Sequence, residues 1–118
     1  DIEKLKKSTS SFPRISYSEC IDILQKDKFD IKWGNDFGSP EETHIANKYD
    51  TPVIVYGFPS KIKAFYMKRD PENKDVVLGM DILAPEGYGE IIGGSERETD
   101  VNILLDCLCL YRGMFARC

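Results

Sequence analysis

The sequence predicts an α+β fold, in which a sheet is flanked by helices, and three observations support this class. Two helix-start patterns lie in the first half of the chain, at Ser16 and at Ser39. Two apolar, β-rich runs follow, over residues 53–58 and 62–67. An apolar alternation that begins at Val76 then leads into a glycine-rich hairpin. Helices that are segregated from a run of strands are typical of α+β proteins.

A capping box predicts the first helix. Ser16 stands three residues before Glu19, and in this pattern each side chain bonds to the backbone N–H of the other residue. We expect this helix to continue to about Lys26. Its apolar side would be formed by Cys20, Ile21, Ile23 and Leu24.

Residues 39–42, Ser-Pro-Glu-Glu, predict a second helix start by the same logic. Pro40 suits the first helical position, where a missing N–H costs nothing, and Glu42 would return to the cap. The only histidine, His44, falls in this helix, and we interpret it as a surface residue rather than a metal ligand. Three residues would face inward: Ile45, Ala46 and Tyr49.

Three strands are predicted after these helices. Residues 53–58 form a continuous apolar run that ends at Pro59, and residues 62–67 form a second run. Residues 70–73, Asp-Pro-Glu-Asn, indicate a surface turn before the third strand. In the third strand, four apolar residues recur at period two: Val76, Leu78, Met80 and Ile82. This alternation would place Asp81 on the face away from the core.

The third strand leads into a hairpin. Residues 84–87, Ala-Pro-Glu-Gly, predict its turn, because Pro fixes one φ angle and Gly permits a positive one. If this loop closes the hairpin symmetrically, Leu83 faces Tyr88 and Asp81 faces Glu90.

Asp81 and Glu90 would thus form a close carboxylate pair. Opposed Cβ atoms in a sheet lie about 5 Å apart, and like charges placed so are destabilising unless something neutralises them. Mg²⁺ is typically held by one or two carboxylates and by substrate phosphates, which fits this pair. The alternative is that both carboxylates lie on a solvated face. Further on, Gly93 and Gly94 would let a ligand or another backbone approach closely, and Arg97 follows within reach.

Composition limits the classes of partner. The net charge is −4 and the pI is near 5.0, whereas phosphate binding needs clustered Lys and Arg, so this chain is not expected to be a main nucleic-acid surface. There is no signal peptide or long apolar run, so we expect a cytoplasmic protein with no membrane partner. The four cysteines show no Cys-x-x-Cys pair and are expected to be free thiols.

A series of ordered blocks carries a family resemblance. From about Ile2 to about Leu105, the chain closely resembles the asparaginyl-tRNA synthetases, a branch of the class II synthetases close to the aspartyl enzymes. The form Glu-Gly-Tyr-Gly-Glu-Ile-Ile-Gly-Gly-Ser is similar to the asparaginyl branch rather than the aspartyl one. The blocks are residues 12–19, 33–43, 62–68 and 81–98.

The resemblance implies an antiparallel-sheet catalytic domain that activates asparagine with ATP and Mg²⁺ and passes it to its tRNA. Asp81 and Glu90 match the acidic positions that hold ATP-bound Mg²⁺. Arg97 matches the arginine that reads the amino-acid side chain, and Lys63 and Tyr66 match positions that line the amino-acid pocket. A spacing of three puts two residues on opposite faces of a straight strand, so Lys63 or Tyr66 must lie at a bulge or strand end.

Several family features are missing from these 118 residues: the dimer-interface segment, the Arg-containing second signature, the glycine-rich final signature and the anticodon-binding barrel. We therefore interpret the chain as an interior piece of the catalytic domain that should not catalyse alone. In the intact family, the resemblance implies a homodimer whose tRNA is held mostly outside this chain. Residues 1–11 are interpreted as a linker or helix remnant, 12–105 as a partial catalytic domain and 106–118 as a divergent tail.

The sequence leaves some alternatives open. The tail could arise from a truncation, a shifted reading frame, a splice variant or a divergent paralogue. A non-catalytic synthetase paralogue could keep the pocket and bind asparagine, aspartate or a nucleotide. A synthetase-related ligase that makes asparagine from aspartate is built on the same catalytic domain, and it would need the missing signatures too.

Overall fold

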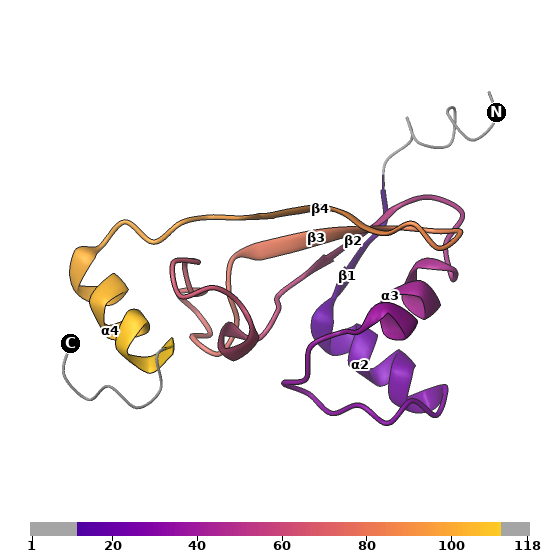
Figure 1. The fold of residues 1–118 in the computed structure, drawn as a ribbon, viewed down its shortest axis with the longest axis horizontal. Coiled ribbons are helices and arrows are strands. Elements are labelled where there is room, and N and C mark those ends of the chain that lie inside the picture. The colour runs from indigo at the N-terminus through magenta and orange to yellow at the C-terminus, as the bar shows by residue number, and fades with distance from the viewer. Residues whose placement is uncertain (1–11, 112–118) are drawn as a thin grey trace.

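The computed structural model describes residues 12–111, which form one four-stranded sheet and three α-helices (Figure 1). In spatial order the strands are β1 (Arg14–Ser16), β2 (Val53–Tyr56), β3 (Gly79–Ala84) and β4 (Gly89–Ser95). β1 and β2 pair in parallel, and the other two pairs are antiparallel. The predicted α+β class is confirmed, with a sheet that is mostly antiparallel.

Helix α2 (Tyr17–Lys26) begins with the predicted capping box. The backbone N–H of Glu19 donates to the Ser16 hydroxyl at 3.2 Å, and the Ser16 N–H donates to the Glu19 carboxylate at 3.3 Å. The predicted apolar side is confirmed, with Ile23 only partly buried. Tyr17, which was not assigned to this side, is fully buried as well.

Helix α3 (Ser39–Ala46) does not have the predicted capping box. Its N-cap is Gly38, and no side chain bonds to the cap, because the helix already includes Ser39. The N–H of Glu42 donates to the Gly38 carbonyl at 3.1 Å, as in a normal first turn. The Glu42 carboxylate is therefore not used as a cap. The predicted inward residues are confirmed: Ile45 and Ala46 are fully buried, and Tyr49 packs against the core.

The strand predicted over residues 62–67 is wrong. The chain forms a short 3₁₀ helix, η1 (Ser60–Ile62), and then turns. Its backbone makes single bridges instead of a ladder, and Leu78 donates to the Lys68 carbonyl at 2.8 Å. Residues 76–78 make single bridges and isolated backbone bonds, to Phe58, Lys68 and Glu96 among others, so the ladder of β3 starts only at Gly79.

The hairpin between β3 and β4 has a different register from the symmetric one predicted. Leu83 pairs with Glu90, and Asp81 pairs with Gly93. The register shifts because Ile91 and Ile92 together lie opposite Ile82, which makes a β-bulge. The prediction that Asp81 directly faces Glu90 is therefore wrong.

Asp81 also lies on the other face from the one predicted. Its neighbour on β2 is Val55, and the neighbour of Leu83 is Val53. Both valines are fully buried, and directly paired residues share a face of a sheet. Asp81 thus points to the same side as the core, toward the helices.

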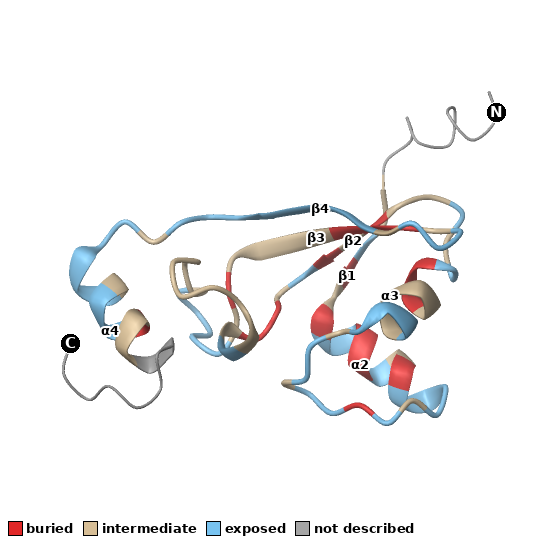
Figure 2. Ribbon diagram, viewed as in Figure 1, coloured by how far each residue is buried: buried red, intermediate tan, exposed pale blue. Residues whose placement is uncertain are grey.

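The core lies between this face of the sheet and helices α2 and α3, where Figure 2 shows most of the buried positions. β4 is almost entirely exposed, and helix α4 (Val101–Tyr111) lies at the far end of the molecule (Figures 1 and 2). Within residues 12–111, no helix is both long and apolar enough to cross a membrane.

The cysteines only partly follow the prediction of free thiols. Cys20 and Cys107 are free and buried, and burial raises the pKa of Cys20 to about 12. Cys109 is disulfide-bonded, so the prediction is wrong for this residue. Cys118, the proposed linker at residues 1–11 and the tail from residue 112 onward lie outside the described residues.

Candidate functional site

A small polar cavity lies where α3 approaches β3 and β4. Its volume is about 110 Å³. Four carboxylates and a single ammonium converge on it, so negative charge is in excess when all are ionised. A cation of small size would complement this cavity. Its lining residues are Asp36, Phe37, Glu42, Phe58, Lys63, Asp81, Leu83 and Glu90.

The bulge and a glycine bring Asp81 and Glu90 together, although they are not paired directly. Glu90 follows the turn at the start of β4 and faces the same side as Asp81. Gly93, the direct partner of Asp81, has no side chain to fill the space between them. A Cβ atom at Gly93 would lie 2.6 Å from a Glu90 carboxylate oxygen and 3.3 Å from an Asp81 oxygen. The two carboxylates therefore lie side by side over Gly93.

Lys63 supplies the cation of the cavity. It lies just after η1, so the helix end and not a strand directs its side chain. Its Nζ lies 3.1 Å from Asp81 Oδ2 and 4.1 Å from the centroid of the Phe58 ring. The Lys63 and Asp81 side chains are only 20% and 16% exposed, so this ion pair is weakly screened by solvent.

The pKa values reflect the crowding of negative charge. Burial raises the pKa of Glu42, and the nearby charges of Glu90, Asp81 and Asp36 raise it further. Burial also raises the pKa of Glu90, followed by the charge of Asp81, while Lys63 lowers it. Lys63 thus offsets only part of the repulsion. A bound cation would relieve the rest.

Tyr66 and Arg97 form a second group. The Arg97 guanidinium carbon lies 4.5 Å from the centroid of the Tyr66 ring, a cation–π contact. The backbones of the two segments are also joined, because Glu98 donates to the Tyr66 carbonyl at 2.9 Å and Met67 bridges Arg97. The structure therefore gathers Lys63, Asp81 and Glu90 in the cavity, and it pairs Tyr66 with Arg97 outside the cavity lining.

Asp36 and Glu42 were missed as candidate site residues. The sequence predicts Glu42 as a capping residue, and Asp36 lies in the resemblance block of residues 33–43 without a role of its own. Both come from a segment about forty residues before Asp81, and the tertiary fold brings them together. The sequence signal was Gly38, which serves as a cap itself and so leaves the Glu42 carboxylate available for the cavity.

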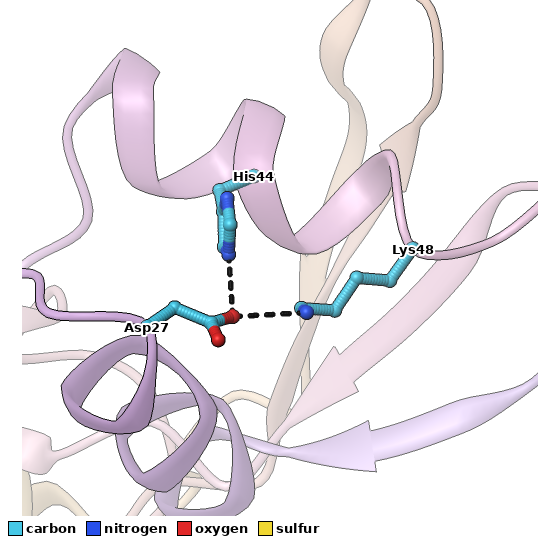
Figure 3. Close-up of polar contacts among 3 residues, drawn as sticks. All are labelled: Asp27, His44 and Lys48. Carbon is cyan, nitrogen blue, oxygen red and sulfur yellow. Dashed lines mark hydrogen bonds and ion pairs between the residues drawn. The ribbon is translucent and has the colours of Figure 1, made fainter.

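A polar contact holds α3 against the end of α2. Asp27, the C-cap of α2, accepts from His44 at 2.7 Å and from Lys48 at 2.9 Å (Figure 3). The bond from His44, followed by that from Lys48, lowers the pKa of Asp27. His44 packs its ring against Phe29 as well, with centroids 4.8 Å apart. His44 thus has a role at the surface between two helices.

Comparison with known proteins defines the class. Residues 1–110 match the family model described as tRNA synthetases class II (D, K and N), and the chain therefore belongs to this family. The fold of the described residues agrees with this assignment.

Two similar solved structures belong to the asparaginyl branch of this family. The chain is similar to asparaginyl-tRNA synthetase from Pyrococcus horikoshii complexed with asparaginyl-adenylate, with 53% identity and a TM-score of 0.88 over 97% of this chain. The asparaginyl-tRNA synthetase from Entamoeba histolytica, also in complex with asparaginyl-adenylate, matches 87% of this chain with 31% identity and a TM-score of 0.80. The resemblance inferred from the sequence is confirmed. The chain spans 26% and 24% of these two relatives' chains.

Proposed function

We propose that this chain supplies the amino-acid activation site of an asparagine–tRNA ligase. Such an enzyme joins asparagine to ATP as asparaginyl-adenylate and transfers it to its tRNA. The acidic cavity with its single lysine carries the proposal, because it presents a cluster of anions to the α-ammonium group of an amino acid. The similarity to synthetases solved with asparaginyl-adenylate supports it.

We assign the α-ammonium end of the amino acid to the cavity and its side chain to the pair formed by Tyr66 and Arg97. Asp36 and Glu42 are suited to the α-ammonium group, because both line the cavity and neither is paired with Lys63. Lys63 and Tyr66 would line the amino-acid pocket. Arg97 would donate a charge-assisted hydrogen bond to the carboxamide oxygen of the asparagine side chain.

Asp81 and Glu90 fit Mg²⁺ by the chemistry of their donors. Mg²⁺ prefers hard oxygen ligands and is commonly bound by two carboxylates together with substrate phosphates. No group of three or more His, Cys, Asp or Glu side chains is arranged to hold a metal in the part of the chain that the structure describes. In the full-length enzyme, ATP phosphates would complete the coordination begun by the two carboxylates. The bound ion would neutralise phosphate charge during adenylate formation.

The intact enzyme would be a homodimeric, cytoplasmic protein of translation. Most of its tRNA-binding surface would lie in other segments, because this chain carries a net charge of −4.

The test is asparagine-dependent ATP–pyrophosphate exchange by a full-length synthetase that carries this sequence. Exchange with asparagine and much weaker exchange with aspartate are expected. Binding of asparagine without exchange would favour a non-catalytic paralogue, and formation of free asparagine from aspartate would favour the related ligase. Either result would overturn the proposal.

The isolated 118-residue chain is expected to show no exchange above a heat-killed control. Preorganised donors usually supply the largest share of catalysis, and the ATP-gripping arginines of the family were not found in this sequence. Exchange by the isolated chain would contradict this prediction.

A further inference from the structure

The hydroxyl of Tyr17 reaches from helix α2 into the loop of residues 32–37. Tyr17 is the first residue of the helix and is fully buried. Its hydroxyl donates to the Asn35 carbonyl at 2.5 Å and accepts from the Gly34 N–H at 3.0 Å. One side chain thus satisfies two backbone groups of a loop that follows it by seventeen residues.

The ring of Tyr17 touches the walls of the acidic cavity. It stacks on Phe37 with centroids 5.1 Å apart and contacts Phe58 at 5.6 Å, and both phenylalanines line the cavity. Phe58 in turn lies under the Lys63 ammonium. Tyr17 itself does not line the cavity. It therefore acts on the site only through its neighbours.

The loop needs such an anchor because its other backbone bonds are mostly local. Asn35 donates to the Lys32 carbonyl at 3.0 Å, and its side chain accepts from the Lys32 N–H at 2.9 Å. These bonds fold the loop on itself but do not attach it to the domain. Phe37 packs its ring against Phe58, with centroids 6.0 Å apart. The hydrogen-bonded anchors of the loop are Tyr17 and Trp33, whose indole N–H donates to the Ser18 hydroxyl at 2.9 Å. Of these two anchors, only Tyr17 also contacts Phe37 and thus the cavity wall.

The hydroxyl is also suited to donate at neutral pH. Burial raises the pKa of Tyr17, so the phenol stays protonated.

We propose that Tyr17 is a positioning residue for the amino-acid substrate, because its hydroxyl holds the loop that places Asp36 and Phe37 in the cavity wall. The inference rests on the proposed function. Tyr17→Phe keeps the stacked ring but leaves the Asn35 carbonyl and the Gly34 N–H without their partner. If asparagine binding must restore the placement that these bonds provide, the KM for asparagine rises by about tenfold.

The first experiment reports the loop directly in the 118-residue chain. Trp33, the only tryptophan, lies in this loop, edge-on to Tyr17 with centroids 5.8 Å apart. Tyr17→Phe should make Trp33 fluorescence more easily quenched by acrylamide. The matched control is Tyr49→Phe, which removes a hydroxyl from another tyrosine packed on the core and should leave quenching unchanged. Equal quenching in all three proteins would overturn the anchoring role.

The second experiment measures pyrophosphate exchange in the full-length synthetase. Tyr17→Phe should raise the KM for asparagine about tenfold, while kcat and the KM for ATP stay within about twofold. Tyr49→Phe should match the wild type. An active wild type in which Tyr17→Phe leaves the asparagine KM unchanged would overturn the inference alone. A wild type without asparagine-dependent exchange would instead overturn the proposed function.

If Tyr17→Phe does not fold, a second variant tests the same inference. Asn35→Ala removes the side chain that closes the loop's own turn, at an exposed position outside the core. It should raise the asparagine KM in the same direction. An unchanged KM would show that the placement of this loop does not set substrate affinity, and would overturn the inference.

Discussion

At the scale of single residues, Gly93 decides where the Glu90 carboxylate lies. The Cβ of Gly93→Ala would collide with this carboxylate, which would swing away from Asp81 at little cost to the fold, because it is the end of a flexible side chain. We expect Mg-ATP binding by the full-length enzyme to weaken about tenfold, which is about 1.4 kcal/mol. Calorimetric titration with Mg-ATP measures this change.

Gly94→Ala is the matched control. A Cβ at Gly94 meets no atom within 4 Å, so this variant should bind Mg-ATP within about twofold of the wild type. If both alanine variants bind equally well, Glu90 does not act with Asp81 at the metal.

Arg97 gives a second prediction at this scale. Its guanidinium is held by the Tyr66 ring and would face the substrate side chain in the full-length enzyme. Arg97→Ala should cost about 2–4 kcal/mol of transition-state binding, or about thirty- to a thousandfold in kcat/KM for asparagine. Lys68→Ala, which removes a nearby ion pair to Glu96 at 3.8 Å, should have little effect. An Arg97→Ala enzyme with unchanged kinetics toward asparagine would refute the assignment.

At the scale of elements, the contact between α2 and α3 predicts a pH dependence. The pKa of Asp27 is lowered in the folded chain, so its stabilising effect is complete above the unfolded value near 3.8 and is lost as the pH falls below it. Asp27→Asn should lower the Tm at pH 5, and the difference from the wild type should shrink toward pH 3. Thermal melts monitored by circular dichroism at the two pH values test this.

The variant must be compared with the wild type at each pH, because Glu42 and Glu90 change the stability with pH in the direction opposite to Asp27. Their pKa values are raised, so the folded state binds protons more tightly and gains stability as the pH falls toward the unfolded value near 4.5. A difference in Tm that stays constant from pH 5 to pH 3 would rule out the contribution of Asp27.

Local signals predicted local structure well. The capping box at Ser16 defined the start of α2, since its two bonds span only three residues. The start of α3 was misplaced, because Gly38 caps the helix without a side-chain bond. The strand predicted over residues 62–67 does not form, because the chain turns after η1 and its backbone makes single bridges instead of a ladder. An apolar run does not by itself show whether it has a strand partner.

The candidate site was predicted in part. Asp81, Glu90 and Lys63 line the same cavity. The predicted hairpin register, in which Asp81 directly faces Glu90, was wrong. One extra residue in a bulge changes the pairing of a whole strand, and no local sequence pattern near Ile91 predicts this bulge. Asp36 and Glu42 depend on how the helices dock on the sheet, which is a tertiary property.

At the scale of the whole molecule, β4 and most of α4 are exposed among the residues that the structure describes. Exposed apolar side chains lie on β2, β4 and α4: Tyr56 at 46%, Ile91 at 50%, Ile92 at 53%, Val101 at 65%, Ile103 at 43% and Leu105 at 48%. Apolar patches of this kind mark association sites. The 118-residue chain should therefore self-associate at high micromolar concentration under reducing conditions, as measured by light scattering.

Ile103→Lys combined with Leu105→Lys should reduce this association. The control is Asp22→Lys, which makes the same change of +2 in charge at an exposed position of α2 and should leave association unchanged. A wild-type chain that scatters as a monomer would contradict the prediction.

The β-bulge divides the ladder between β3 and β4 into two parts. Pairing on the turn side ends at Glu90, and pairing on the other side resumes at Ile92. A chain that lacked Ile91 would pair one-to-one, with Glu90 and Gly93 still on the face of Asp81. A hairpin shorter by this one residue could therefore carry the same carboxylate pair. The number of residues between two acids is, for this reason, a poor guide to whether they share a site.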